Sequence, residues 1–205
     1  CGINKILGIQ FNLYGPGLTA AQYFFAGVVI VLSGISSTLS RSNVRRALKI
    51  LAVAIVVTAV TYLFNPSATI YFGILHCLAV CILIYGLTLQ KAKALTCAAA
   101  GVFVFGLSLA LSLMMRNVPV DFDWLLPFGI SSHTLSSYDY FPLLPWFGVF
   151  LIGAALAKSV YAARQSLIRR RLPESFINVA GRHSLLIYIV HQPILLGALY
   201  LLGLM

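Results

Sequence analysis

Residues 46–64 read RALKILAVAIVVTAVTYLF, a stretch that begins with a basic residue and carries no charge after Lys49. A transmembrane helix needs roughly 20 predominantly apolar residues to cross about 30 Å of hydrocarbon, and this stretch supplies them. The whole chain has the same character, because 60% of its residues are hydrophobic, only 9% are charged and the mean hydropathy is +0.97. Soluble domains contain about one quarter charged residues. We therefore predict an integral membrane protein of the all-α class.

Six stretches of the chain meet this criterion of length and hydropathy, which predicts a polytopic transmembrane helix bundle. We place the spans at residues 18–40, 46–64, 70–89, 94–115, 141–162 and 183–204. Residues 18–205 then form a single transmembrane domain. Residues 1–17 form an outward N-terminal segment that ends in a turn at Gly15, Pro16 and Gly17.

Basic residues gather in alternate connections between these spans. They are Arg41, Arg45, Arg46 and Lys49 in the first, Lys91 and Lys93 in the third, and Lys158, Arg164, Arg169, Arg170 and Arg171 around the last. The positive-inside rule places those connections in the cytoplasm and the other two, 65–69 and 116–140, outside. The net charge of +10 is thus a signal of topology, and nucleic acid is not an expected partner.

Cysteine spacing and known short motifs predict neither a metal nor a nucleotide site. Cys77 and Cys81 are four residues apart on one helix face, where a small buried side chain is the ordinary role, and the spacing is not that of a zinc site. The chain contains no Walker loop, dinucleotide fingerprint or nucleophile elbow. Any chemistry must come from polar residues within or beside the helices.

Polar side chains at membrane depth are energetically unfavourable, so each is a candidate for a functional site. At a rise of 1.5 Å per residue, His76 lies about 9 Å below the outer end of the third predicted span and His191 about 12 Å from the inner end of the last. Asp139 precedes the fifth span on the outer side, and Arg182 stands at the inner end of the last. For His76, Asp139 and Arg182, taken singly, a packing, solvated or interface-anchoring role is the preferred interpretation.

His191 is the exception, because GRHSLLIYIVHQPIL (residues 181–195) places Gln192 and Pro193 directly after it. Proline has no N–H, so the carbonyl of Ile189 loses its helical partner. An opened backbone beside a histidine and an amide is typical of helices that line a polar cavity. We predict that His191 belongs to a hydrated cavity.

Four ordered motifs carry a family resemblance: SGISSTLSRSNVRRALKI, IYFGILHCLAV, DYFPLLPWFGVFLIG and GRHSLLIYIVHQPIL. They resemble the bacterial membrane proteins related to heparan-α-glucosaminide N-acetyltransferase. The resemblance covers residues 18–90 and 139–204, whereas 91–138 matches only in hydropathy. It implies a multispan acyltransferase in the bacterial cytoplasmic membrane that takes an acetyl group from cytosolic acetyl-CoA and passes it to an extracytoplasmic sugar amine or hydroxyl.

Acetyl transfer needs a base, because a protonated amine cannot attack a thioester. A neutral histidine, with a pKa of about 6.5, suits this role, and a carboxylate can orient it. Our first candidate for the base is His191 and the second is His76, with Asp139 as the orienting or acceptor-binding group. At the cytosolic side, the guanidinium groups of Arg45, Arg46 and Arg182 suit the phosphates of CoA. We expect no metal.

The chain departs from the family at its start. The family normally begins with a further helix that carries an Arg-Gly pair and a terminal histidine and aspartate, and we expect that helix to precede Cys1, in preference to a lipidated Cys1. The catalytic histidine proposed for the lysosomal enzyme falls where this chain has Asn12 and Tyr14, so it is not carried over.

A second hypothesis is a non-catalytic membrane subunit or carrier, in which His191 and His76 line a path or fix an assembly. The expected partners are the lipid bilayer and a small-molecule or glycan acceptor for the enzyme. For the subunit they are further copies of the chain or other members of a membrane complex.

Overall fold

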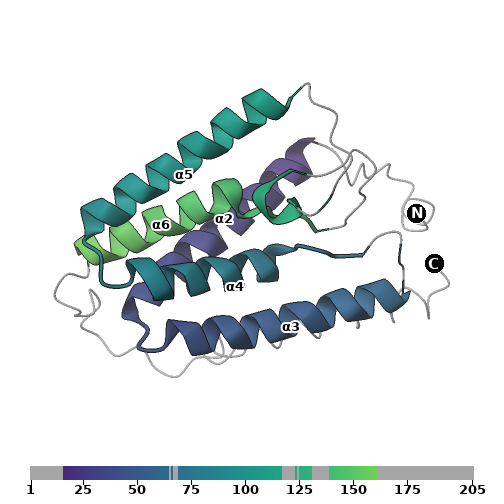
Figure 1. Ribbon diagram of the computed structural model, residues 1–205, viewed down its shortest axis with the longest axis horizontal. Coiled ribbons are helices and arrows are strands. Elements are labelled where there is room, and N and C mark those ends of the chain that lie inside the picture. The colour runs from purple at the N-terminus through teal and green to yellow at the C-terminus, as the bar shows by residue number, and fades with distance from the viewer. Residues whose placement is uncertain are drawn as a thin grey trace. The chain divides into compact units, whose positions relative to one another are not determined.

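The computed structural model describes residues 16–64, 66, 69–116, 123, 125–130 and 139–160. Nearly all of them belong to one compact unit, residues 21–165; the other unit, residues 1–20 and 166–205, contributes only the first turn of a helix to this set. The described elements are all helical: α2 (Pro16–Leu39), α3 (Asn43–Phe64), α4 (Ile74–Ile84), the π-helix η2 (Tyr85–Leu89), α5 (Ala94–Met115), the 3₁₀ helix η3 (Leu126–Phe128) and α6 (Leu143–Val160) (Figure 1).

The all-α membrane character predicted from the sequence is confirmed for this part of the chain. Four helices are long and apolar enough to cross a membrane: Thr19–Leu39, Asn43–Leu63, Ala94–Met115 and Leu143–Val160. They coincide with the first, second, fourth and fifth predicted spans to within a few residues. The sixth, 183–204, lies outside the described residues.

The third predicted span was placed too early. The apolar helix here runs from Ile74 to Leu89, and residues 70–73 that precede it are not helical. The reason is that the N–H and C=O groups of Ile70 bond to threonine side chains of α3 and not to helical partners. His76 is therefore the third residue of the helix and lies in its first turn.

The helices pack as two neighbouring pairs, α3 with α4 and α5 with α6, and α4 also contacts α6 (Figure 1). Fully buried side chains of α2, η2 and α6, namely Ile30, Tyr85 and Phe150, belong to one hydrophobic core cluster. Large apolar side chains elsewhere are exposed, including Leu63 and Leu95 at 80% each. Exposed apolar surface on this scale is what lipid-facing helices present to acyl chains.

Glycines allow the closest approaches between helices. A Cβ added at Gly34 of α2 would overlap the carbonyl oxygen of Phe150 in α6, and one added at Gly148 would lie 2.9 Å from the carbonyl oxygen of Gly101 in α5. Small residues at helix crossings are the usual means of bringing membrane helices into van der Waals contact. Helix α6 is thus held against both α2 and α5 by backbone proximity.

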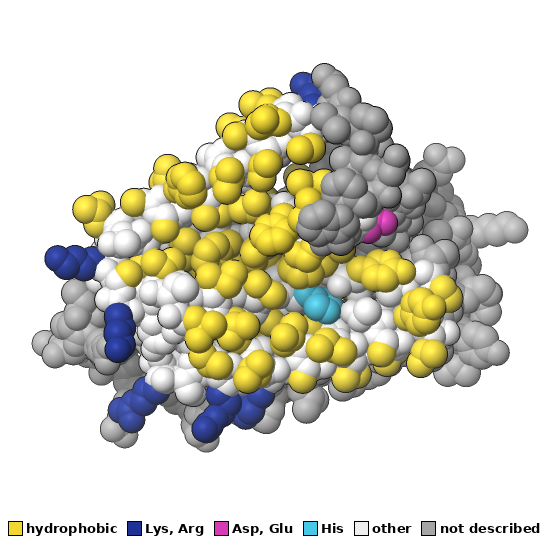
Figure 2. Space-filling model, viewed as in Figure 1, with side chains coloured by type: hydrophobic (Ala, Val, Ile, Leu, Met, Phe, Trp, Pro, Cys, Tyr) yellow, Lys and Arg dark blue, Asp and Glu magenta, His cyan; other side chains and the backbone are white. Residues whose placement is uncertain are grey.

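Charge is distributed unevenly along the bundle. Most of the Lys and Arg side chains seen in Figure 2 lie at the left and lower left, and a further one lies at the top. Apolar side chains cover the middle, and the acidic side chain lies toward the right. We call residues 40–49 and 90–93 together with Lys158 the basic end. We call residues 70–76, with the side chains of Thr58 and Asp139 that bond to them, the α4 entry. The two lie at opposite ends of α4 and η2.

Candidate site at the α4 entry

The α4 entry brings together two of the predicted site residues, Asp139 and His76. Asp139 bonds to the backbone of Ile74 and His76 to that of the adjacent Gly73. Gly73 is the N-cap residue and has no side chain with which to satisfy the free N–H groups of the first turn. The two titratable side chains supply the capping partners that glycine lacks.

Asp139 reaches the helix from the segment before α6. Its Oδ2 accepts a hydrogen bond of 3.2 Å from the N–H of Ile74, and two residues later the N–H of Phe141 donates to the carbonyl of Phe72 at 3.1 Å. A carboxylate at a helix N-terminus also interacts favourably with the helix dipole. These two bonds hold the start of α6 to the start of α4.

The close approach of Asp139 explains why residue 73 is a glycine. A Cβ at this position would lie 2.6 Å from Oδ2 of Asp139 and 2.8 Å from Cγ2 of Ile70. The backbone of Gly73 is extended, with φ −89° and ψ −175°, so the requirement is for space and not for an unusual conformation.

The environment of Asp139 alters its acidity. Burial raises the pKa of this carboxyl group above its ordinary value, and the hydrogen bond from the N–H of Ile74 acts in the opposite direction. Burial is the larger of the two effects, so the group keeps its proton to a higher pH than an exposed aspartate does.

His76 is buried and uses both ring nitrogens. Nδ1 lies 3.4 Å from the backbone N–H of Gly73, and Nε2 lies 3.3 Å from the hydroxyl of Thr58 in α3. The ring also packs against Phe72, with the ring centroids 5.8 Å apart. The side chain therefore links α4, its entry segment and α3.

Two threonines of α3, Thr58 and Thr61, also bond to the α4 entry, and the sequence analysis did not single them out. Thr58 donates to the carbonyl of Ile70 at 2.7 Å, and the N–H of Ile70 donates to Thr61 at 3.3 Å. The two threonines are three apart, hence on one face of α3. The signal that could have identified them is a pair of threonine hydroxyls on one face of a largely apolar span.

At the basic end, the two described arginines that we predicted to bind phosphate differ in burial and in hydrogen bonding. Arg45 is exposed, whereas Arg46 is half-buried and donates from Nη1 to the hydroxyl of Ser36 at 2.6 Å. Arg45 and Lys49, both exposed, are four residues apart and so share a face of α3.

Lys158, also at the basic end, binds backbone carbonyl groups of the protein itself. It donates to the carbonyls of Leu89, Gln90 and Ala92 at 2.9, 3.1 and 2.6 Å and so caps the end of η2.

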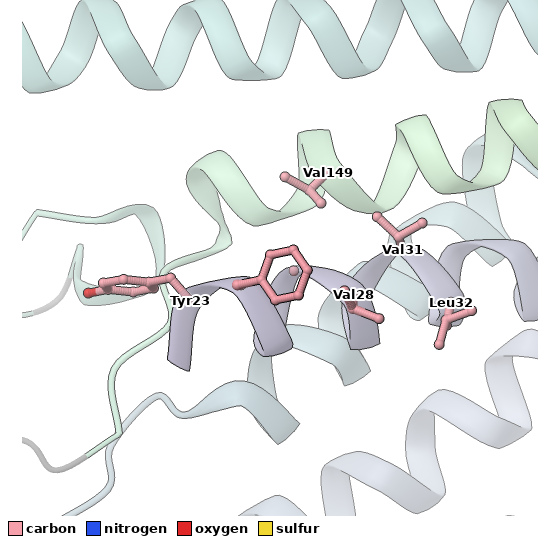
Figure 3. A pocket seen from close by; sticks show the side chains of 7 residues that line it. Tyr23, Val28, Val31, Leu32 and Val149 are labelled. Carbon is pink, nitrogen blue, oxygen red and sulfur yellow. The ribbon is translucent and has the colours of Figure 1, made fainter. Parts of the chain in front are cut away.

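An apolar groove runs between α2 and α6, lined by Tyr23, Phe24, Gly27, Val28, Val31, Leu32 and Val149 (Figure 3). Apart from the Tyr23 hydroxyl its side chains offer no polar group, so it has the character of a lipid-facing surface and not of a site for transfer chemistry.

Among the residues that the structure describes, no group of three or more His, Cys, Asp or Glu side chains is placed to hold a metal ion. His191 and Arg182 lie outside the described residues, and their predicted roles stay predictions.

Comparison with protein-family models matches residues 3–193 to the model described as heparan-alpha-glucosaminide N-acetyltransferase, catalytic. The chain belongs to this family. The match confirms the relation suggested by the four sequence motifs, and it extends through residues 91–138, where the motifs indicated only similar hydropathy. The chain is thus a member of a family of acetyltransferase catalytic domains, and four helices in the part that the structure describes are long and apolar enough to cross a membrane. No curated protein and no solved structure matches it.

Proposed function

We propose that the protein is a membrane acetyltransferase that takes an acetyl group from acetyl-CoA on the cytosolic side of a bacterial cytoplasmic membrane. The acetyl group passes to a sugar amine or hydroxyl on the other side. The observation that carries the proposal is the family match over residues 3–193. It is supported by the position of His76 and Asp139 at the end of α4 opposite the basic end.

The proposed topology has six spans, with the basic end in the cytoplasm and the α4 entry outside. Labelling of single cysteines in a background without the four native ones tests it. A cysteine replacing Asp123 should react with an impermeant thiol reagent added from outside, and one replacing Ser42, in the exposed connection between α2 and α3, should not. The reverse pattern contradicts the topology.

The basic end suits the phosphates of CoA. Arg45 and Lys49 present two exposed cations on one face, and guanidinium groups bind phosphate oxygens in a bidentate manner. Nη1 of Arg46 donates a hydrogen bond to the hydroxyl of Ser36, so the guanidinium group of this α3 residue points toward α2. In the proposal Arg45, Arg46 and Arg182 hold the phosphates, and acetyl-CoA supplies the activated acyl group.

In the transfer step a bond forms between the acceptor nitrogen or oxygen and the acetyl carbon while the carbon–sulfur bond breaks. The acceptor loses one proton and the departing thiolate gains one. A base of suitable pKa must therefore stand near the acceptor. We assign this role first to His191 and second to His76, with Asp139 orienting the base or binding the acceptor.

The second candidate function, a non-catalytic subunit or carrier, is favoured by one observation. Both ring nitrogens of His76 are already bonded to protein groups, as expected of a histidine that stabilises packing. A catalytic role for His76 requires one of these bonds to give way.

The deciding experiment uses purified full-length protein, labelled acetyl-CoA and a panel of amino sugars and cell-envelope glycans. Replacing His191 by alanine should reduce transfer by roughly 10²–10⁴-fold, the usual contribution of a general base. His183→Ala, on the same predicted span, is the matched control. Unchanged transfer by the His191 variant removes its catalytic role, and failure of the intact protein to bind CoA favours the subunit.

A further inference from the structure

One hydroxyl group at the α4 entry touches both the connecting segment and the histidine ring. Oγ1 of Thr58 lies 2.7 Å from the carbonyl oxygen of Ile70 and 3.3 Å from Nε2 of His76. Thr58 belongs to α3, eighteen positions from His76 in sequence, and its side chain is partly buried. These contacts determine which atom of the ring carries the proton.

A hydroxyl has one hydrogen to donate. The carbonyl oxygen of Ile70 has none, so the hydroxyl of Thr58 must donate to it. Toward His76 the same oxygen can then only accept, and the hydrogen in that contact must come from Nε2. The Thr58 contact therefore requires a proton on Nε2.

The other ring nitrogen leads independently to the same tautomer. The backbone N–H of Gly73 points to Nδ1 of His76 at 3.4 Å, and a backbone amide can only donate. Nδ1 must accept, so it carries no proton. In a neutral imidazole one nitrogen is the donor and the other the acceptor, and both contacts are satisfied only by the Nε2–H form.

We infer that Thr58 is a positioning residue, whose hydroxyl fixes His76 as the Nε2–H tautomer and makes Nδ1 the basic atom of the ring. The inference rests on the proposed function, since the tautomer affects transfer only where His76 handles a proton. A proton taken up by His76 then goes to Nδ1, on the side of the ring that faces Gly73, and replaces the hydrogen bond from that backbone N–H. Protonation of the ring would thereby remove a hydrogen bond that caps the start of α4.

Thr61 provides a matched control. Its hydroxyl oxygen accepts the N–H of Ile70 at 3.3 Å and donates back to the carbonyl of Val57 at 2.9 Å. Thr61→Val removes a side-chain contact to the same residue, Ile70, from the same face of α3. The structure assigns it no hydrogen bond to His76, so a general loosening of this segment affects both variants and a tautomer change only Thr58→Val.

The test is ¹⁵N NMR of histidine-labelled full-length protein in lipid bilayers, in which protonated and unprotonated imidazole nitrogens give separate signals. His76→Gln identifies the signals of His76. The wild type, Thr58→Ser and Thr61→Val should show a protonated Nε2 and an unprotonated Nδ1, whereas Thr58→Val should show a measurable Nδ1–H population. A wild-type ring protonated at Nδ1, or a Thr58→Val spectrum that keeps the single wild-type tautomer, overturns the inference. If Thr58→Val does not fold, Thr58→Ala removes the same hydroxyl and should show the same Nδ1–H population, and a wild-type Nδ1–H signal still overturns the inference.

Transfer assays on the same variants separate this inference from the proposed function. Thr58→Val should lower kcat at least about tenfold relative to Thr61→Val, a part of the roughly 10²–10⁴ that a general base contributes, and Thr58→Ser should restore it. Absence of transfer by the wild type refutes the proposed function, while the spectra still judge Thr58. A changed tautomer with unchanged kcat overturns the positioning role of Thr58 in the reaction.

Discussion

Replacing Gly73 by alanine should break the contact between Asp139 and the start of α4. The new Cβ would lie 2.6 Å from Oδ2 of Asp139, a distance that real Cβ atoms essentially never adopt. The carboxylate is the far end of a flexible side chain and can move away. In moving it loses the 3.2 Å hydrogen bond from the N–H of Ile74, which is therefore the main consequence of the substitution.

The expected cost follows from two opposing effects. A hydrogen bond to a charged group contributes about 1.5–3 kcal/mol to stability. Alanine at an extended position that it can adopt without strain offsets about 0.4–1 kcal/mol by reducing the conformational entropy of the unfolded chain. The net loss should be about 1–2 kcal/mol, which lowers Tm by a few degrees in a chain of this size.

The protein carries its own probe for this measurement. Cys77, Cys81 and Cys97 are free and buried, so a thiol-reactive fluorophore reports unfolding of the detergent-solubilised protein in a Cys1→Ser background. Gly106→Ala is the matched control, because a Cβ at this position of α5 meets nothing within 4 Å.

A double-mutant cycle makes the mechanism refutable. In an Asp139→Ala background the carboxylate is gone, so Gly73→Ala should cost less than in the wild type, and the remaining cost comes from the 2.8 Å approach to Cγ2 of Ile70. If Gly73→Ala is as stable as Gly106→Ala, or costs the same with and without the Asp139 carboxylate, the steric explanation is wrong.

The same assay tests three further features. Gly34→Ala should destabilise by about 1–3 kcal/mol, because the carbonyl of Phe150 that its Cβ would overlap is backbone and cannot swing aside; an unchanged Tm would contradict the α2–α6 contact. Lys158→Met should cost about 1.5–3 kcal/mol by removing the donor to three carbonyls at the end of η2, whereas Lys91→Met, at an exposed position, should be nearly neutral. Burial raises the pKa of Asp139, so the folded protein binds this proton more tightly than the unfolded chain does. The free energy of unfolding should therefore fall as the pH rises from about 3.8 through the folded pKa, and Asp139→Asn should remove that part of the pH dependence; an identical pH profile would refute it.

The helical membrane architecture was predictable because its signals are local. A run of about 20 apolar residues defines a span without reference to any other part of the chain, and the observed α2, α3, α5 and α6 lie within a few residues of the predicted stretches. His76 and Asp139 were also identified by a local criterion, as polar groups at or beside apolar helices. The family relation rested on short ordered motifs, which the family match confirms.

What the sequence by itself determined is therefore the class of fold, four of the helices, the family and two residues of the α4 entry. Only the tertiary structure decided where α4 begins, why residue 73 is a glycine and which groups the two ring nitrogens of His76 contact. These depend on contacts between segments far apart in sequence: Asp139 lies 65 residues from Ile74, and Thr58 lies 12 from Ile70 and 18 from His76. The hydropathy of a threonine or an aspartate is the same wherever it stands. Its role depends on which donor or acceptor helix packing brings within about 3 Å, and no local pattern contains that information.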